Sequence, residues 1–373
     1  MRFSSSLIAL VAFLGQAFAH PSNLIQRDTG LEVKISRVGN TLVKATITNT
    51  AKHEISFVKI NTPFGNGPVH KAQVMKNGVP VQFTGVCAYY DVNNLPPEAF
   101  QVLAAGASAE ATFDVAETAD LSAGGSYSIK SAGTISIVDR TSRTAGVTEA
   151  VEYSSNELTI NVDGAEAAKV KSATEKLNKR TQLQPSCSSR DRRIMEAAIR
   201  LGGRYAQAAA RAASSGSARK FQEYFKTTDS RTRQQVAQRF SSIAREHTTS
   251  GGRTKYHCRD PIGFCLQNPG TIAYTHVFNN VVANCDRFYD NVPAVVNSGH
   301  DTDHGHVTVH EFAHASAVVN PHTRDHAYGY AGSTRLSARL AFNNADNYAL
   351  FATDVARNGG GGGGNGGNDG DEE

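Results

Sequence analysis

The run His310-Glu311-Phe312-Ala313-His314 constrains the fold of this chain more than any other feature. Residues four apart lie on one face of an α-helix. A helix here would therefore bring both imidazoles to one metal ion and place Glu311 beside the water that the metal carries. The stretch from Thr308 to Val319 is apolar and compatible with a helix, which we expect to end near Asn320-Pro321, because proline disfavours helix in the residue before it.

A catalytic zinc ion usually takes a third protein ligand. A histidine six residues after the second one is excluded, because Asn320 stands there, and a nearby downstream glutamate is excluded, because the next one is Glu372. The remaining candidates are Asp325, Asp346, Asp354, His322 and His326. We favour Asp325, since a short turn after Pro321 would return it to the metal. Three residues later, Tyr328 could donate a hydrogen bond to a developing oxyanion.

The order His310-Glu311-x-x-His314, then Thr323-x-Asp325-x-x-Tyr328-Gly329, resembles the fungal deuterolysins, the aspzincin metallopeptidases of the neutral protease II and penicillolysin type. The resemblance implies one zinc ion bound by His310, His314 and Asp325, with Glu311 as general base and acid. It also implies that Tyr328 stabilises the transition state. One position departs from the family pattern, since His322 replaces a glycine. We therefore expect His322 to need an unusual backbone conformation, and its imidazole keeps a histidine alternative to Asp325 open.

The layout of the chain is that of a secreted precursor. Residues 1–19 have the basic start, short apolar run and small residues of a signal peptide. The dibasic pair Lys179-Arg180 predicts a processing site, which makes 20–180 a propeptide and 181–357 the metallopeptidase domain. Residues 358–373 are mostly Gly, Asn and acidic residues, and we expect them to be disordered.

The two predicted domains differ in their patterns. Residues 20–180 are rich in Thr and Val and favour a β-sandwich, with strands expected at 31–35, 41–47, 54–59, 134–138 and 157–162. Residues 190–214 and 219–247 carry apolar side chains at helical intervals. Residues 254–289 predict loops and short strands, and the strand at 271–278 is a candidate edge for holding substrate. We therefore expect a sandwich-like β-rich propeptide followed by a mainly α-helical, α+β, zincin-like catalytic domain.

The five cysteines fit an oxidising compartment. The family resemblance implies the pairs Cys187–Cys258 and Cys265–Cys285. It also implies a third disulfide to a C-terminal cysteine, which this chain lacks; that loss should cost about 2–5 kcal/mol if nothing compensates. The odd cysteine is Cys87, in the predicted propeptide. Its thiolate could cap the zinc and silence the precursor, or it could be an ordinary buried small residue.

Further polar residues near the motif have weaker interpretations. Asp346 could accept the second ring hydrogen of a metal-bound histidine. His300, His304 and His306 are expected to form a polar loop before the helix. The deuterolysin resemblance implies a preference for basic proteins such as protamines and histones, which would need acidic groups near the cleft; the candidates are Asp286, Asp290, Asp301 and Asp303.

The predicted function is a secreted zinc metalloendopeptidase made as a zymogen, with proteins or peptides as substrates. We expect a monomer whose propeptide acts as an intramolecular inhibitor or chaperone. A net charge of +4 over 373 residues is small for a nucleic-acid-binding protein, and no second long apolar run predicts a membrane span. The alternatives are a catalytically degenerate secreted binding protein or effector on the same scaffold, and a metal-scavenging protein.

Overall fold

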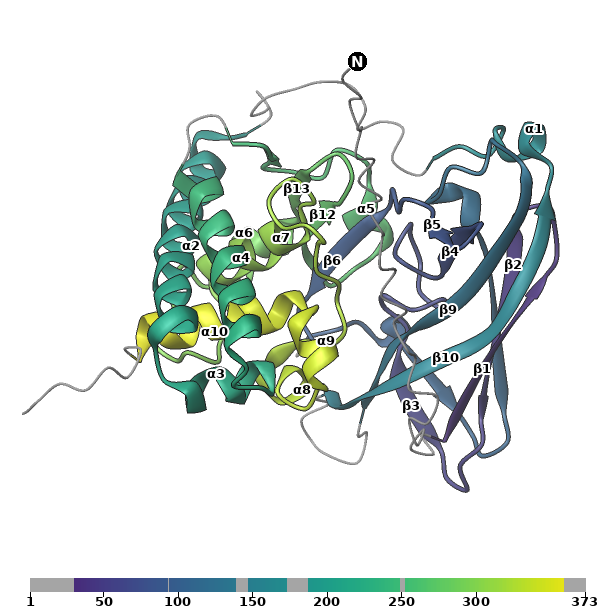
Figure 1. Ribbon diagram of the computed structural model, residues 1–373, viewed down its shortest axis with the longest axis horizontal. Coiled ribbons are helices and arrows are strands. Elements are labelled where there is room, and N and C mark those ends of the chain that lie inside the picture. The colour runs from purple at the N-terminus through teal and green to yellow at the C-terminus, as the bar shows by residue number, and fades with distance from the viewer. Residues whose placement is uncertain (1–29, 93, 139–146, 173–186, 249–251, 359–373) are drawn as a thin grey trace, which may run out of the picture.

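The computed structural model describes residues 30–92, 94–138, 147–172, 187–248 and 252–358. A β-rich region and a mainly helical region lie side by side, and the strand β6 lies between them (Figure 1). This order confirms the coarse fold prediction of a β-rich N-terminal part and a helical C-terminal part. The predicted signal peptide, the dibasic junction and nearly all of the predicted tail lie outside the described residues. Within the described part of the chain, no helix combines the length and apolar character needed to span a membrane.

Two sheets build the N-terminal region. The first has the order β1-β2-β8, and the second has the order β5-β4-β9-β3-β7, with β10 paired to β9. Alternation explains the packing: in β1 the side chains of Leu31, Val33 and Ile35 are buried while the residues between them are exposed. The strands are β1 (Leu31–Arg37), β2 (Leu42–Asn49), β3 (Ile55–Val58), β4 (Gln73–Lys76), β5 (Val79–Pro80), β7 (Phe100–Leu103), β8 (Ser108–Asp114), β9 (Gly125–Val138) and β10 (Val147–Val162).

The five predicted strands each overlap an observed strand, but the sequence analysis underestimated the length of two of them. The ranges 134–138 and 157–162 are parts of a long antiparallel pair, β9 and β10. Strands β4 to β8 were missed. Two short 3-10 helices and one short α-helix complete this region: η1 (Pro97–Ala99), η2 (Val115–Glu117) and α1 (Gly164–Ala167). One apolar cluster, which includes Phe57, Tyr127 and Ile129, fills the space between the sheets.

Long helices dominate the C-terminal region. Helix α2 (Ser189–Ser215) matches the predicted helix at 190–214. The predicted helix at 219–247 is two helices, α3 (Ala218–Phe225) and α4 (Ser230–Thr248). The chain breaks between them because Lys226 adopts a left-handed conformation, with φ of 57°, and Asp229 then caps α4 by accepting the Thr232 N–H at 2.7 Å. The remaining helices are α5 (Phe264–Gln267), α6 (Asp286–Asp290), α7 (His304–His314), α8 (Gly329–Ser333), α9 (Ala338–Phe342) and α10 (Ala345–Arg357).

Helix α2 lies against α7 at a close contact centred on Gly202. A Cβ atom at Gly202 would lie 2.1 Å from the Thr308 hydroxyl and 2.6 Å from a ring nitrogen of His247. The missing side chain therefore lets α2, α4 and α7 approach one another. This packing buries all of α7, including its polar residues.

A second, smaller sheet lies beside α7. Its order is β11-β13-β12-β6, with β11 (Lys255–His257), β12 (Thr271–His276), β13 (Val281–Asn284) and β6 (Val86–Tyr90). The prediction of short strands in 254–289 is confirmed, but β12 is not the free edge that the sequence suggested, because β6 pairs with it. Both predicted disulfides, Cys187–Cys258 and Cys265–Cys285, are present.

Candidate metal centre

Helix α7 carries the His310-Glu311-x-x-His314 run and is fully buried. It begins because Asp303 caps it, accepting the His306 N–H at 2.9 Å. It ends at His314, where Ala315 turns to an extended conformation. The predicted helix, from about Thr308 to Asn320, was therefore placed too late: the helix starts four residues earlier and stops six residues sooner. The motif itself still spans the last two turns, with both imidazoles on one face.

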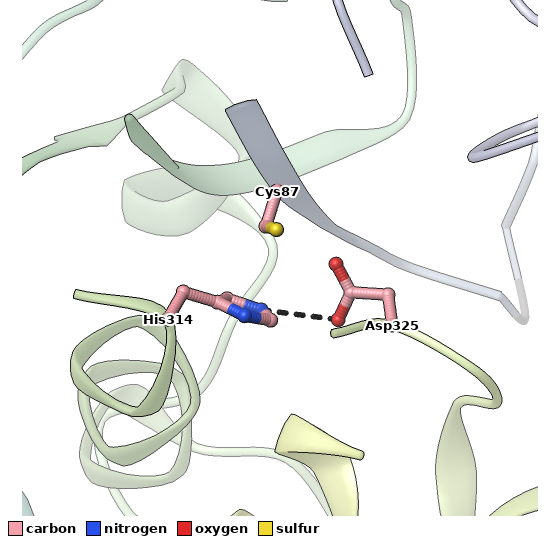
Figure 2. A group of neighbouring side chains, drawn as sticks. All are labelled: Cys87, His314 and Asp325. Carbon is pink, nitrogen blue, oxygen red and sulfur yellow. Dashed lines mark hydrogen bonds and ion pairs between the residues drawn. The ribbon is translucent and has the colours of Figure 1, made fainter. Parts of the chain in front are cut away.

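Three side-chain atoms converge beside this helix. His310 Nε2 lies 3.2 Å from His314 Nε2 and 3.0 Å from Asp325 Oδ1. His314 Nε2 lies 3.1 Å from the same carboxylate oxygen, as Figure 2 shows for that pair. The structure thus brings together the three residues that the sequence proposed as metal ligands.

Both imidazoles are oriented by hydrogen bonds at their second nitrogen. His310 Nδ1 lies 3.3 Å from Asp346 Oδ1, and His314 Nδ1 lies 3.0 Å from the Thr323 carbonyl oxygen. These contacts point both Nε2 atoms at Asp325. The contact expected between Asp346 and a histidine of the motif is present, and such partners commonly fix metal-binding histidines.

Asp325 reaches the cluster because its chain segment is hydrogen-bonded to the residues at the start of α10. The Arg324 N–H donates to the Asn343 carbonyl at 2.8 Å, and the Arg324 carbonyl accepts from the Ala345 N–H at 2.9 Å. The Asn344 side chain accepts the His326 N–H at 2.7 Å. This bridge fixes the carboxylate without a helix or a long strand.

Glu311 lies next to the cluster, with one carboxylate oxygen hydrogen-bonded and the other without a partner among the described residues. The Thr275 hydroxyl donates to Glu311 Oε2 at 2.6 Å. Glu311 Oε1 is buried and has no hydrogen-bond partner among the described residues. Burial raises the pKa of Glu311 to about 7, although the charges of His310 and His314 act in the opposite direction. Such a carboxylate is suited to accept and release a proton near neutral pH.

The charges of the cluster favour a bound cation. Burial would lower the pKa of His310 and of His314, but Asp325 raises both, together with Asp346 at His310 and Cys87 at His314, and the net shifts are upward. Burial would likewise raise the pKa of Asp325, yet the two histidines hold it well below its usual range. The site therefore favours positive charge between these groups, as protons or as a metal ion.

The spacing also fits a small metal ion. Nitrogen and oxygen ligands at about 2.0–2.1 Å from a tetrahedral zinc ion are separated by about 3.3–3.4 Å, close to the 3.0–3.2 Å observed among the three atoms. Asp325 Oδ2, like Glu311 Oε1, is buried without a partner among the described residues. An ion and the water that it carries would supply partners for both.

Tyr328 lies beside the cluster, but it does not lie in a helical turn, which was one of the conformations that would bring its hydroxyl there. Its backbone is extended, with φ of −120°, and it precedes α8. Its hydroxyl donates to the Ala88 carbonyl oxygen at 2.6 Å and also contacts Asn61 Nδ2. Both partners belong to the predicted propeptide. The Tyr328 ring lies 6.1 Å from that of His310, centroid to centroid, while its hydroxyl binds a backbone carbonyl.

Several other expectations need correction. His322 is absent from the residues with positive φ, so its predicted unusual backbone conformation is wrong. His304 and His306 are not in a polar loop but lie in the buried first turn of α7, where His306 Nε2 is 3.2 Å from Asp346 Oδ1. Asp303 is not a surface acid, because it is buried and hydrogen-bonded to the Tyr205 hydroxyl at 2.7 Å. These polar groups are buried because neighbouring side chains satisfy them.

His300 lies near a second group of possible ligands, with Glu223 and Asp354. Lys220 forms ion pairs with both carboxylates of this group: its Nζ lies 2.9 Å from Glu223 Oε2 and 2.9 Å from Asp354 Oδ2. A lysine therefore supplies the positive charge there.

Sequence reasoning missed the supporting residues that are far from the motif along the chain but contact the site in the structure. Thr275 and Asn344 are buried polar residues in a strand and a loop, and no spacing pattern links them to the motif. Cys87 was noted, but not the strand that carries it. Its sulfur, a His314 ring nitrogen and an Asp325 oxygen lie within 4.8 Å of one another (Figure 2).

Comparison with known proteins places these residues in a family context. Residues 1–358 match the family model described as Deuterolysin metalloprotease (M35) family. A neutral protease 2 homologue of Coccidioides posadasii is 51% identical over 361 residues, covering 96% of this chain and all of the relative. Neutral protease 2 of Aspergillus oryzae is 41% identical over 356 residues, covering 95% of this chain and 99% of the relative.

Among solved structures, a zinc peptidase from Grifola frondosa aligns with 45% of this chain and 96% of its own. The sequence identity is 22% and the TM-score is 0.37, a level of similarity that does not define a shared fold.

Proposed function

Because this chain belongs to the deuterolysin metalloprotease family, we propose that it is a secreted zinc endopeptidase made as a zymogen. The observation that carries this proposal is the convergence of His310, His314 and Asp325 beside the buried carboxylate of Glu311. On this proposal the C-terminal region, with its HExxH helix and small sheet, is a zincin-like catalytic domain.

His310, His314 and Asp325 would hold one zinc ion per chain. When bound, zinc polarises a substrate carbonyl and lowers the pKa of water. Asp346 and the Thr323 carbonyl keep the two imidazoles turned toward that position. The histidines and the aspartate are therefore binding residues, and the proton transfers belong to Glu311.

Glu311 is the general base and acid in this mechanism. Thr275 fixes its Oε2, which leaves Oε1 free to accept a proton from the attacking water. The same oxygen can then pass that proton to the leaving nitrogen of the cleaved peptide bond. Burial keeps the proton affinity of this carboxylate high enough for both transfers.

Tyr328 is the proposed donor to the developing oxyanion. Its hydroxyl already donates to a backbone carbonyl oxygen, that of Ala88, at 2.6 Å. A substrate carbonyl in a similar place would receive the same hydrogen bond, strengthened as negative charge develops on its oxygen.

The zymogen proposal assigns residues 20–180 to a propeptide, cut after Arg180, in a protein that works as a monomer. Its support is the strand β6, which belongs to the predicted propeptide yet pairs with β12 of the catalytic region. A substrate that adds a strand to β12 would need the same edge. Removal of the N-terminal region would free this edge.

We also propose a preference for basic protein substrates, such as histones and protamines. Of the four acidic candidates, Asp286 is exposed but paired with Arg259, and Asp303 is buried. Asp290 and Asp301 are exposed. If these two attract basic substrates, replacing both by Asn should lower the rate on histone more than the rate on casein, and more so at low salt.

The test of the function uses the full chain cut after Arg180. Its hydrolysis of casein and of histone is measured before and after a chelator, and again after zinc is restored. We expect activity to disappear with the chelator and return with zinc. A folded, zinc-loaded chain without hydrolysis would instead favour the catalytically degenerate binding protein.

A further inference from the structure

Strand β6 covers the sheet edge that faces the metal centre. Cys87 is paired with Thr275 and Ala88 with Tyr274, in antiparallel register with β12. Thr275 is also the residue that holds Glu311. The pairing therefore places the middle of β6 beside the residues proposed for catalysis, in an extended conformation like that of a bound peptide.

The side chain of Cys87 points into the cluster of ligands. Its sulfur lies within 4.8 Å of both a His314 ring nitrogen and an Asp325 oxygen, and all three side chains face one another in Figure 2. His310 Nε2 lies 3.2 Å from His314 Nε2 and 3.0 Å from Asp325 Oδ1. Thiolate sulfur is among the commonest zinc ligands.

Two buried carboxylate oxygens without partners point to a ligand at this place. Glu311 Oε1 and Asp325 Oδ2 are buried and have no hydrogen-bond partner among the described residues. The Glu311 side chain is fully buried, and that of Asp325 is 3% exposed. Because buried charged oxygens are costly without partners, a cation between these residues and Cys87 accounts for the arrangement better than packing alone.

The backbone of β6 also makes the contact expected of a substrate. The Ala88 carbonyl oxygen, one residue after Cys87, accepts the hydrogen bond of the Tyr328 hydroxyl at 2.6 Å and a second one from Asn61 Nδ2 at 3.2 Å. The proposed oxyanion donor is thus occupied by the main chain of the N-terminal region. A substrate cannot reach Tyr328 while β6 is in place.

We propose that β6 is an internal substrate-like segment, and that Cys87 in the uncut chain binds the metal as a thiolate beside His310, His314 and Asp325. On binding, the thiol proton passes to solvent, and the sulfur takes the position that the attacking water needs. No oxidation or reduction occurs. The inference rests on the proposed function and specifies how the precursor is kept inactive.

The test replaces zinc by cobalt(II) in the full, uncut chain and records its absorption spectrum. A thiolate bound to cobalt gives a strong near-ultraviolet charge-transfer band, while the weaker visible bands report bound cobalt whatever the ligands. The assignment is unambiguous, because the other four cysteines form the two disulfides and Cys87 is the free one. We expect the band in the unmodified chain, its loss in Cys87→Ser, and its loss after cleavage at Arg180 and removal of the N-terminal region.

The matched control is Val86→Ala, which removes buried volume from the same strand but leaves the thiol, and should keep the band. Visible cobalt bands in Cys87→Ser show that the variant is folded around the metal. Visible bands without the charge-transfer band in the unmodified chain would overturn the proposal, as would a band that survives Cys87→Ser.

The cut chain separates this inference from the proposed function. If the spectrum contradicts thiolate binding but the cut chain hydrolyses casein with zinc, only the inference fails. If the thiolate band is present but the cut, zinc-loaded chain hydrolyses nothing, the proposed function fails and Cys87 is simply a metal ligand.

Discussion

The N-terminal and C-terminal regions bury different kinds of polar side chain. Among the described residues of the N-terminal region, the buried polar side chains are neutral Ser, Thr and Asn. The C-terminal region instead buries ionisable groups, including Asp303, His306, Glu311 and Asp346. Burying such groups opposes folding unless partners satisfy them. The comparison shows that the first region is organised as an apolar scaffold, while the second carries costly groups that serve a site.

Strand β6 is the exception to this division. By position in the chain it belongs to the N-terminal region, but it pairs with β12 and packs in an apolar cluster with Tyr274 and Phe264 of the C-terminal region. The two regions are therefore joined at the edge of β12, the strand beside the candidate metal centre. Substitutions in the two regions and a change of pH test whether this division holds.

Glu311→Gln in the cut chain should have the largest effect. Removing the general base is expected to lower kcat/KM by about 10²–10⁴-fold. The zinc content should stay unchanged, because Glu311 contributes none of the three converging atoms. The amide removes a buried ionisable group, so stability should not fall. Peptide hydrolysis, zinc analysis and denaturant unfolding measure the three quantities; near-normal turnover would exclude Glu311 as the base.

Phe57→Ala and Phe351→Ala compare the two cores directly. Both side chains are fully or almost fully buried, and each truncation should lower the free energy of unfolding by about 3–5 kcal/mol. Phe351 lies in α10, the helix that carries Asp346, so its loss should also weaken zinc binding. Phe57→Ala should leave zinc binding unchanged. Equal effects of both variants on zinc affinity would contradict the division of roles.

Asp346→Ala should weaken zinc binding by about 10–100-fold, because His310 would lose the partner that orients its ring. Asp354→Ala is the matched control. Asp354 is buried in the same helix but binds Tyr224 and Lys220, away from the cluster. Competition with a chelator measures the affinities. If Asp354→Ala weakened zinc binding as strongly, a general loss of packing would explain both results.

Acid should destabilise the C-terminal region through His247. Burial lowers the pKa of His247 to about 4, against about 6.5 when unfolded. Because the folded pKa is depressed, this contribution to stability is complete above pH 6.5 and is lost as the pH falls toward 4. The loss should be on the order of 2–3 kcal/mol.

Denaturant unfolding across this pH range measures the His247 contribution. His247→Gln should show a smaller loss between pH 6.5 and 4 than the unmodified chain. An identical pH dependence in the two proteins would show that His247 does not contribute.

The smallest effect is expected at the surface between the regions. Arg339 of α9 lies 2.8 Å from Glu152 of β10, and both side chains are largely exposed. Such pairs are typically worth about 0–1 kcal/mol and weaken with salt. Glu152→Gln should therefore change neither precursor stability nor cleavage measurably. A large loss of stability would mean that this contact, and not β6, holds the regions together.

The sequence predicted the parts of the molecule whose signals are local. Alternation located strands such as β1 and β2, helical spacing located α2, and the His310-Glu311-x-x-His314 run identified the helix that carries the centre. The family resemblance supplied both disulfides. Each of these features is determined by residues close in the chain or by a pattern shared with relatives.

What the sequence did not predict depends on contacts between distant segments. The strand around Cys87 is short and almost entirely buried, so it lacks the alternation that identifies a half-exposed strand. The placement of Asp325 depends on a bridge to Asn344, and that of Glu311 on Thr275. His304 and His306 looked like loop residues because His300, Asp301 and Asp303 crowd the same stretch, yet burial and capping by Asp303 make them helical.

A zinc titration of the cut chain tests whether one zinc ion and Glu311 together carry out hydrolysis. The chain is stripped with a chelator, zinc is added in steps, and casein hydrolysis is measured at each step, with Glu311→Gln alongside. We predict that hydrolysis rises linearly and saturates at one zinc ion per chain, and that Glu311→Gln binds the same amount without turnover. Full zinc uptake by a folded chain with no hydrolysis at any step would show that the chain is not a zinc endopeptidase.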